Sequence, residues 1–207
     1  MATQRFSQRR GFTAVQLVVV IALLLLAVAF LGPVVARIRE AAARTQSGNN
    51  LKQFGLAVHN FAGTYNGRLP PGAGEELAKA GSIHFHLLPY LEQQPLYIKG
   101  TTAVWDNDVW STRVALFLDP RDVSGPPGNV YKDWLATTNY AANALLFSDK
   151  PRYKISNIPD GTSFTLMFAT RYQMCNGTPT AWGYPSMYTW APVTAYYNQS
   201  PPQFAAP

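Results

Sequence analysis

The chain has 207 residues, 47% of them hydrophobic, with a formal net charge of +6 and a single cysteine, Cys175. This length allows one ordinary domain together with a membrane segment, and a lone cysteine excludes an intramolecular disulfide. The positive charge does not indicate a nucleic-acid partner, because the basic residues are scattered and form neither a stripe nor a known nucleic-acid motif.

An almost unbroken apolar run follows a short basic segment. No residue from Leu17 to Ala36 is charged, and 20 helical residues span about 30 Å, the thickness of a bilayer's hydrocarbon core. A cleavable secretory signal, with its cleavage site at Val34-Val35-Ala36, is one interpretation, although the run exceeds the roughly 7–15 apolar residues of such signals. A plain single-pass anchor is another, and the arginines on both sides leave its topology open.

A third interpretation accounts for more residues. Arg9-Arg10-Gly11-Phe12-Thr13, directly before the apolar run, resembles the signal of type IV pilins and type II secretion pseudopilins. The resemblance implies a leader at residues 1–11, cleavage by prepilin peptidase between Gly11 and Phe12, and methylation of Phe12. The helix of residues 12–36 would stay in the bacterial inner membrane, with the N-terminus cytoplasmic and the soluble domain periplasmic. Pro33 falls where pilin helices commonly carry a proline, which tends to kink a helix.

Gln16 departs from the pilin pattern. Pilins usually carry glutamate at the fifth mature position, where it neutralises the N-terminal amine of a neighbouring subunit during assembly. A carboxylate inside a bilayer is expensive unless it is paired, so its usual presence implies a functional partner. Glutamine accepts a hydrogen bond but supplies no charge. We therefore expect cleavage as in the family, and a minor or non-polymerising role.

The helical pattern continues beyond the apolar run. Apolar residues recur at spacings of three and four as Leu51, Phe54, Val58, Phe61 and Tyr65, which predicts one face of an amphipathic helix. A single helix from Thr13 to Ala62 is expected, its stalk covering residues 37–66. Gly48-Asn49-Asn50 is a point where it would kink or break, and Gly63 followed by Pro70-Pro71 ends it.

Several sequence blocks resemble a large family of pseudopilin-like proteins, similar to general secretion pathway protein G, whose soluble domain has no established function. The blocks are "ARIREAAARTQSGNNLKQFGLAVHNFAGTYNGRLPPG", "LLPYLEQQPLY", "TTNYAAN" and "IPDGTSFTLMF". Members usually carry a cysteine near Leu118-Asp119-Pro120, an acidic residue near Thr170-Arg171 and a glycine-rich last strand. All three are absent, so the domain of residues 67–207 is expected to be shortened or to close its sheet differently.

Beyond Pro71 the sequence alternates short strand-like runs and turns, which predicts an α+β pilin-like fold with the long helix packed on a small antiparallel sheet. Leu88–Tyr97 is expected to hold a short helix with Pro89 in its first turn. Pro159-Asp160-Gly161 is expected to form a turn. The best predicted strands are Ile83–Leu87, Arg113–Leu118 and Phe164–Ala169.

Catalytic groupings are not indicated by any motif, and no cofactor is expected. His84 and His86 would share one face of a strand, a pair that zinc can use, but no CxxC or HExxH motif accompanies them, so structural histidines are favoured. Asp106 and Asp108 could supply oxygens to calcium, although a solvated acidic turn is favoured. A bystander role is favoured for Cys175.

The aromatic tail carries an alternative function. Six rings near the C-terminus suit either core packing or a surface that recognises glycan or protein: Trp182, Tyr184, Tyr188, Trp190, Tyr196 and Tyr197. The main expectation is a non-enzymatic pseudopilin-like subunit of a type II secretion or type IV pilus-like envelope assembly. Its partners would be prepilin peptidase, other pilin or pseudopilin subunits and the inner membrane, without nucleic acid. The alternative is an anchored or secreted binding module that uses the aromatic tail.

Overall fold

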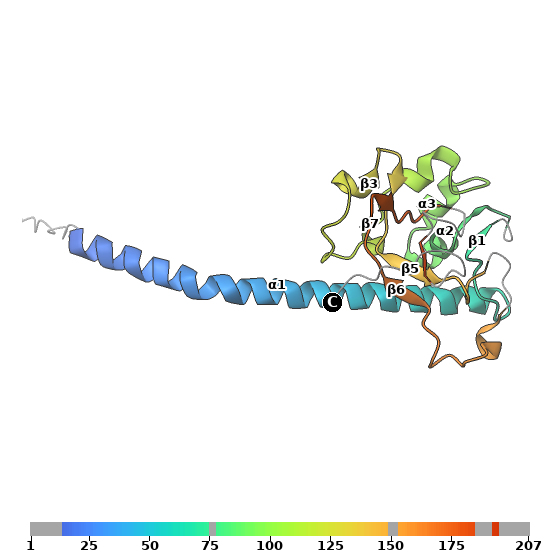
Figure 1. The fold of residues 1–207 in the computed structure, drawn as a ribbon, viewed down its shortest axis with the longest axis horizontal. Helices are drawn as coiled ribbons and strands as arrows, with labels where there is room; N and C mark the ends of the chain where they lie inside the picture. The colour runs from blue at the N-terminus through green and yellow to red at the C-terminus, as the bar shows by residue number, and fades with distance from the viewer. Residues whose placement is uncertain (1–13, 75–77, 149–152, 185–191, 195–207) are drawn as a thin grey trace, which may run out of the picture. The chain divides into compact units, whose positions relative to one another are not determined.

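The computed structural model describes residues 14–74, 78–148, 153–184 and 192–194. The chain divides into two compact units, Met1–Ala42 and Ala43–Pro207. One long helix, several short helices and small sheets make up the structure (Figure 1). The predicted α+β class with a long N-terminal helix is confirmed.

The elements are short, apart from the first helix. The α-helices are α1 (Ala14–Thr64), α2 (Ile83–Leu87) and α3 (Gln94–Lys99). The 3₁₀ helices are η1 (Leu88–Leu91), η2 (Asp106–Ser111), η3 (Ala115–Phe117), η4 (Pro127–Asn129) and η5 (Ile155–Asn157). The strands are β1 (Ala73–Gly74), β2 (Gly81–Ser82), β3 (Val130–Tyr131), β4 (Leu135–Ala136), β5 (Tyr140–Asn143), β6 (Phe168–Thr170), β7 (Met174–Cys175), β8 (Thr178–Pro179) and β9 (Val193–Thr194).

Helix α1 is continuous over 51 residues, from Ala14 to Thr64. Its bounds agree with the predicted helix to within two residues. The predicted break at Gly48-Asn49-Asn50 is wrong, because the helix runs through this segment and the Asn50 side chain is buried and hydrogen-bonded. The helix ends where Asn66 (φ 54°) and Gly67 (φ 81°) turn left-handed, and the Gly67 N–H donates to the Ala62 carbonyl at 2.7 Å.

The largest sheet in the described part of the chain has three strands in the order β6-β5-β9. β5 pairs antiparallel with β6, placing Ala141 opposite Ala169, and parallel with β9, placing Ala142 opposite Val193. The predicted sheet was entirely antiparallel, so the parallel β5–β9 pairing corrects it. The other described sheets are the antiparallel pairs β1–β2, β3–β4 and β7–β8.

Four local predictions need correction. Ile83–Leu87 is helix α2 and not a strand, because the Ser82 hydroxyl caps it by accepting from the Phe85 N–H at 3.3 Å. Arg113–Leu118 contains the 3₁₀ turn η3, and the strand expected from Phe164 begins only at Phe168. The helix expected over Leu88–Tyr97 is divided between η1 and α3, with Pro89 in the first turn of η1 as predicted.

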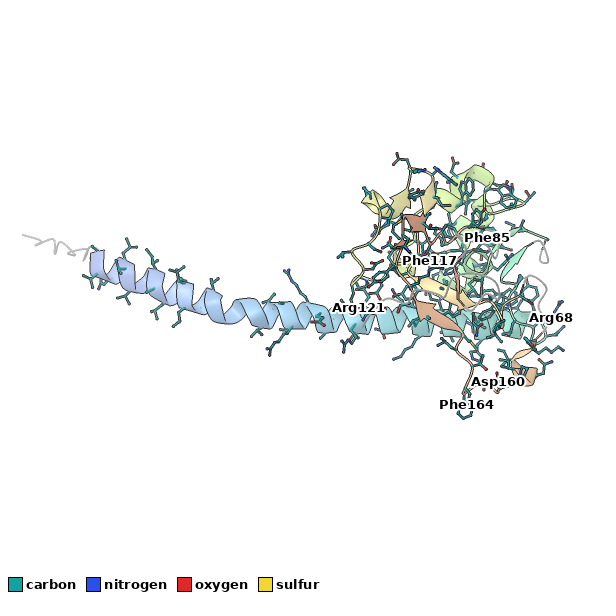
Figure 2. All side chains as sticks on the ribbon, in the orientation of Figure 1. Arg68, Phe85, Phe117, Arg121, Asp160 and Phe164 are labelled. Atoms are coloured by element: carbon teal, nitrogen blue, oxygen red, sulfur yellow. The ribbon has the colours of Figure 1, made fainter. Side chains whose placement is uncertain are left out.

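Aromatic rings from distant parts of the sequence form the core. Phe54 of α1 contacts the rings of Phe117, Tyr140 and Phe168 at centroid distances of 5.6, 5.3 and 4.9 Å. Phe117 lies among the side chains of the core, whereas Phe164 lies at the tip of an outlying loop (Figure 2). These contacts join the second half of α1 to the rest of its unit, and that half is therefore part of the domain.

Candidate assembly helix and candidate binding residues

The predicted processing and assembly residues lie at the start of the chain or in α1. Gly11 and Phe12 lie outside the described residues. Gln16 lies in the first turn of α1 with an exposed side chain. Pro33 lies inside α1, and the helix continues through it.

The apolar segment, Val15–Val35, carries apolar side chains on all sides of α1. Every large apolar side chain described in it is exposed, from 43% at Val20 to 73% at Val15. Continuous exposed apolar surface of this kind marks a region that lipid or another protein covers, because water hydrates it unfavourably. The segment therefore has the surface expected of an assembly or membrane helix.

No helix in the described part of the chain is both long enough and apolar enough to cross a membrane. The transmembrane span predicted for residues 12–36 stays a prediction from the sequence.

The second half of α1 buries the predicted stripe. Phe54 and Val58 are fully buried, Phe61 is nearly so, and Leu51 is partly buried. Tyr65, the last predicted member, is 37% exposed but stacks on Phe61 at 4.4 Å. The amphipathic pattern is confirmed for this half of the helix, which packs its apolar face on the domain core.

A polar cluster of Ser47, Asn50, Asp119, Arg121 and Tyr140 extends the same face of α1. The Ser47 hydroxyl donates to Asp119 Oδ2 at 2.7 Å, and the Asn50 amide donates to the Tyr140 hydroxyl oxygen at 3.1 Å. Arg121 donates to the same carboxylate from Nε at 3.1 Å and from Nη2 at 2.8 Å. Each member of the cluster is hydrogen-bonded, so the polar cluster fixes the axial position of α1 on the domain.

Charge in the polar cluster is compensated. Burial on its own would raise the pKa of Asp119, but hydrogen bonds from Arg121 and Ser47 outweigh it and hold the pKa below its usual value. Burial raises the pKa of the Tyr140 phenol, and the Asp119 charge adds to the effect. At neutral pH the cluster therefore contains one carboxylate, one guanidinium and a neutral phenol.

The polar cluster was not identified from the sequence. Ser47 lies three residues before Asn50, and Asn50 lies four residues before Phe54. The two polar residues therefore continue the helical spacing of the apolar stripe. That continuation was the available signal. Their partners Asp119 and Tyr140 lie 72 and 90 residues away, and no local pattern connects them.

The proposed histidine pair does not form a zinc site. Because Ile83–Leu87 is helical, His84 and His86 are about 200° apart around the axis and point in different directions. His84 packs its ring against Phe54 and Phe117 at 5.3 and 5.0 Å. Among the described residues, no group of three or more potential ligands is placed to hold a metal ion. Both histidines are buried components of the core, as the favoured interpretation held.

The two buried imidazoles titrate far below the usual range. Burial lowers the pKa of His84 to about 3, with a small opposing effect of the Tyr140 backbone. Burial likewise lowers the pKa of His86 to about 4, opposed by the backbones of Gly74 and Gly81. No ring nitrogen of either histidine makes a hydrogen bond of ordinary geometry within the described structure. Both side chains are therefore neutral near pH 7.

The calcium candidates have a structural role. Asp106 Oδ2 accepts from the Thr101 hydroxyl, from the N–H and hydroxyl of Thr102 and from the Ala103 N–H, at 2.6–2.9 Å. These bonds hold the pKa of Asp106 below its usual range, and the bond from the Thr102 N–H has the largest effect. Asp108 is exposed and left-handed at φ 59°. Asp106 therefore closes a loop, and its bonded oxygen is not available as a calcium ligand.

The aromatic tail is only partly described. Trp182 is fully buried, packs its ring at a tilt against Phe117 with 5.4 Å between the ring centroids, and donates from Nε1 to the Thr112 carbonyl at 3.0 Å. Tyr184 is half-buried, and the other four predicted rings, Tyr188, Trp190, Tyr196 and Tyr197, lie outside the described residues. Trp182 serves the core and is not available as a recognition surface. Cys175 is a half-buried free thiol in β7.

Comparison with known proteins places the chain in a family. A family model described as "Protein of unknown function (DUF1559)" matches residues 36–174, about two thirds of the chain. No curated protein and no solved structure matches the chain. The match covers the second half of α1, the polar cluster and the three-stranded sheet apart from β9. The chain belongs to the DUF1559 family, which is typical of type II secretion pseudopilin-like proteins.

Proposed function

We propose that the chain is a non-enzymatic structural subunit of a type II secretion or type IV pilus-like envelope assembly, similar in role to general secretion pathway protein G. The observation that carries the proposal is the apolar segment of α1, whose described large side chains are all exposed. Neighbouring helices of the same kind, or lipid before assembly, would cover this surface. Family membership supports a pilin-like, secretion-related protein.

The proposal gives the two halves of α1 different tasks. The apolar segment would hold the chain in the inner membrane and then pack beside other pilin or pseudopilin subunits. The uncharged run Leu17–Ala36 supports this from the sequence. The stripe and the polar cluster would keep the periplasmic domain rigidly attached to the helix. Prepilin peptidase would free Phe12 by cleaving after Gly11.

The N-terminus of the mature protein tests the proposal. In cells with an intact prepilin peptidase, mass spectrometry should find a chain that begins with N-methylated Phe12. Gly11→Val should leave the leader attached, whereas Gly32→Ala is the matched control, since a Cβ at Gly32 meets no atom within 4 Å. A mature chain beginning at Arg37 would report signal-peptidase cleavage after Ala36 and would contradict the proposal.

Gln16 tests the assembly step separately. Gln16→Glu restores the charge that pilins use to neutralise a neighbouring N-terminus. In cells with a working pilus machine, incorporation of this variant protein into filaments should therefore exceed that of wild type. Gln46→Glu makes the same chemical change at an exposed position later in α1 and should have no effect. Equal incorporation of wild type and Gln16→Glu would show that residue 16 does not limit assembly.

A further inference from the structure

A cavity of about 330 Å³ opens on the domain surface, lined among the described residues by Ala78, Ala80, Thr102, Ala103 and Trp105. Two chain segments form it side by side. The Ala80 N–H donates to the Thr102 carbonyl at 2.8 Å, and the Val104 N–H donates to the Ala80 carbonyl at 2.8 Å. The backbone is fixed on both sides, so the cavity is a formed feature of the fold.

Trp105 supplies an aromatic surface at this cavity. Its side chain is 45% exposed, and among the described residues it stacks on no other ring. Trp182, by contrast, is fully buried in the core. Among the described residues, the other side chains that line the cavity are three alanines and a threonine, which are too small to cover the indole. A ligand entering the cavity therefore meets a flat apolar face beside a small-residue floor.

A fixed carboxylate lies next to this aromatic surface. Thr102 and Ala103 both line the cavity, and both donate hydrogen bonds to Asp106 Oδ2. Asp106 itself is not among the described lining residues, and its second oxygen, Oδ1, accepts no hydrogen bond from the described residues. Because these bonds hold the pKa of Asp106 below its usual range, the group is an ionised acceptor at ordinary pH.

We propose that the Trp105 cavity binds one ring of a neutral sugar. The C–H face of a pyranose would stack on the indole, and its hydroxyls would donate to Asp106 Oδ1. The volume lies at the lower end of the range for ligand pockets, which suits one ring and not a lipid or a peptide of several residues. No cation lines the cavity among the described residues, and Lys79 Nζ is held by the Tyr97 and Gly100 carbonyls at 2.9 and 2.5 Å. That composition disfavours phosphate and acidic sugars.

Binding of defined probes to the full chain tests the proposal. The protein is kept in micelles of an oligoethylene glycol ether, because detergents with sugar headgroups would compete. Isothermal titration with methyl glucoside, methyl mannoside and N-acetylglucosamine should show a Kd of about 1–10 mM for at least one. Sodium phosphate and tetramethylammonium chloride, titrated in parallel, should not bind. Failure of all three sugars at 50 mM, or binding of phosphate or tetramethylammonium instead, would overturn the assignment.

Two variants tie the binding to this cavity. Trp105→Ala should weaken sugar binding by about tenfold or more, because the stacking surface is lost. Ala78→Leu keeps the indole but fills the cavity from an exposed position, and should weaken binding to a similar extent. Phe164→Ala removes an exposed aromatic from a separate loop and should bind as wild type (Figure 2). Wild-type affinity in both cavity variants would refute the site. None of these results depends on filament assembly, so the proposed function is tested independently.

Discussion

The two halves of α1 are the same secondary structure with opposite surroundings. In the apolar segment, Val15–Val35, every described large side chain is exposed, whereas in the second half Phe54, Val58 and Phe61 are buried. The first half has no polar side, whereas the second half has one. Only the second half can therefore bury its apolar face against its own domain and leave its polar face in water. The chain therefore buries the apolar face of one half of the helix internally and leaves the apolar side chains of the other half exposed, a surface that the proposed function assigns to lipid or other subunits.

Truncation of Phe54 should have the largest effect on this comparison. Phe54→Ala removes the ring that contacts Phe117, Tyr140 and Phe168, and should lower the free energy of unfolding of the domain by about 3–5 kcal/mol. Leu56→Ala, on the exposed side of the same half-helix, and Leu24→Ala in the apolar segment should each change it by less than about 0.5 kcal/mol. Urea unfolding followed by near-ultraviolet circular dichroism measures all three. Equal losses in Phe54→Ala and Leu24→Ala would remove the distinction between the halves.

Acid should destabilise the domain that packs on the second half of α1, through the buried histidines of α2. The pKa values of His84 and His86 fall from 6.5 in the unfolded chain to about 3 and about 4 in the fold, so below pH 6.5 the unfolded chain binds more protons. Stability is then lost as the pH falls, by roughly 2 kcal/mol per histidine between pH 7 and pH 5.

Replacement of the histidines checks this dependence. The double change of His84 and His86 to Leu should flatten the fall in stability between pH 7 and pH 5, as measured by urea unfolding. His59→Leu alters an exposed histidine of α1 and should leave the slope unchanged. A wild-type slope in the double variant would assign the acid sensitivity to other groups.

Removal of the Asp119 carboxylate should have an intermediate effect. Asp119→Ala leaves Ser47 and Arg121 without their shared acceptor, and should cost about 2 kcal/mol. The value is modest because the Arg121 side chain is 33% exposed and water screens its charge. Asp160→Ala removes an exposed carboxylate and should stay within about 0.5 kcal/mol. Thermal unfolding of both variants provides the measurement, and equal melting temperatures would mean that the polar cluster adds no stability.

The smallest expected effect comes from a glycine in the second half. A Cβ at Gly48 meets no atom within 4 Å, so Gly48→Ala should stabilise the domain by about 0.5–1 kcal/mol through helix propensity. Gly32→Ala meets equally open space in the first half, but should leave the domain's melting temperature unchanged. A shift of the same size in both variants would show that the two halves melt together.

The sequence predicted α1 from two signals, the long uncharged run Leu17–Ala36 and the three- and four-residue spacing of apolar residues from Leu51 to Tyr65. Periodicity failed for Ile83–Leu87, because its isoleucine, leucine, phenylalanine and two histidines suit a buried strand as well as a helix. The Ser82 cap stabilises the helix. Periodicity also missed β5, since Tyr140–Asn143 contains two alanines and an asparagine, residues with low strand propensity. Tertiary packing places that strand, and all of its residues except Asn143 are buried.

The candidate sites follow the same division. The exposed apolar segment was predictable from composition alone. A single helix cannot by itself bury apolar side chains that lie on all of its sides. The polar cluster and the Trp105 cavity were not predictable, since each joins segments that only the fold brings together. Spacing also suggested His84 as a zinc ligand and Asp106 as a calcium ligand. In the structure, His84 is buried and Asp106 is hydrogen-bonded within its loop, so both have structural roles.

The parallel pairing of β5 with β9 can form only late in synthesis of the chain. Ala142 and its partner Val193 are about fifty residues apart, so the middle strand keeps one side open until most of the polypeptide has been made. During that interval the nascent domain presents unpaired backbone to other chains, a state prone to aggregation. Folding of this protein would therefore benefit from a holdase chaperone that releases its client only after the late strand has been made.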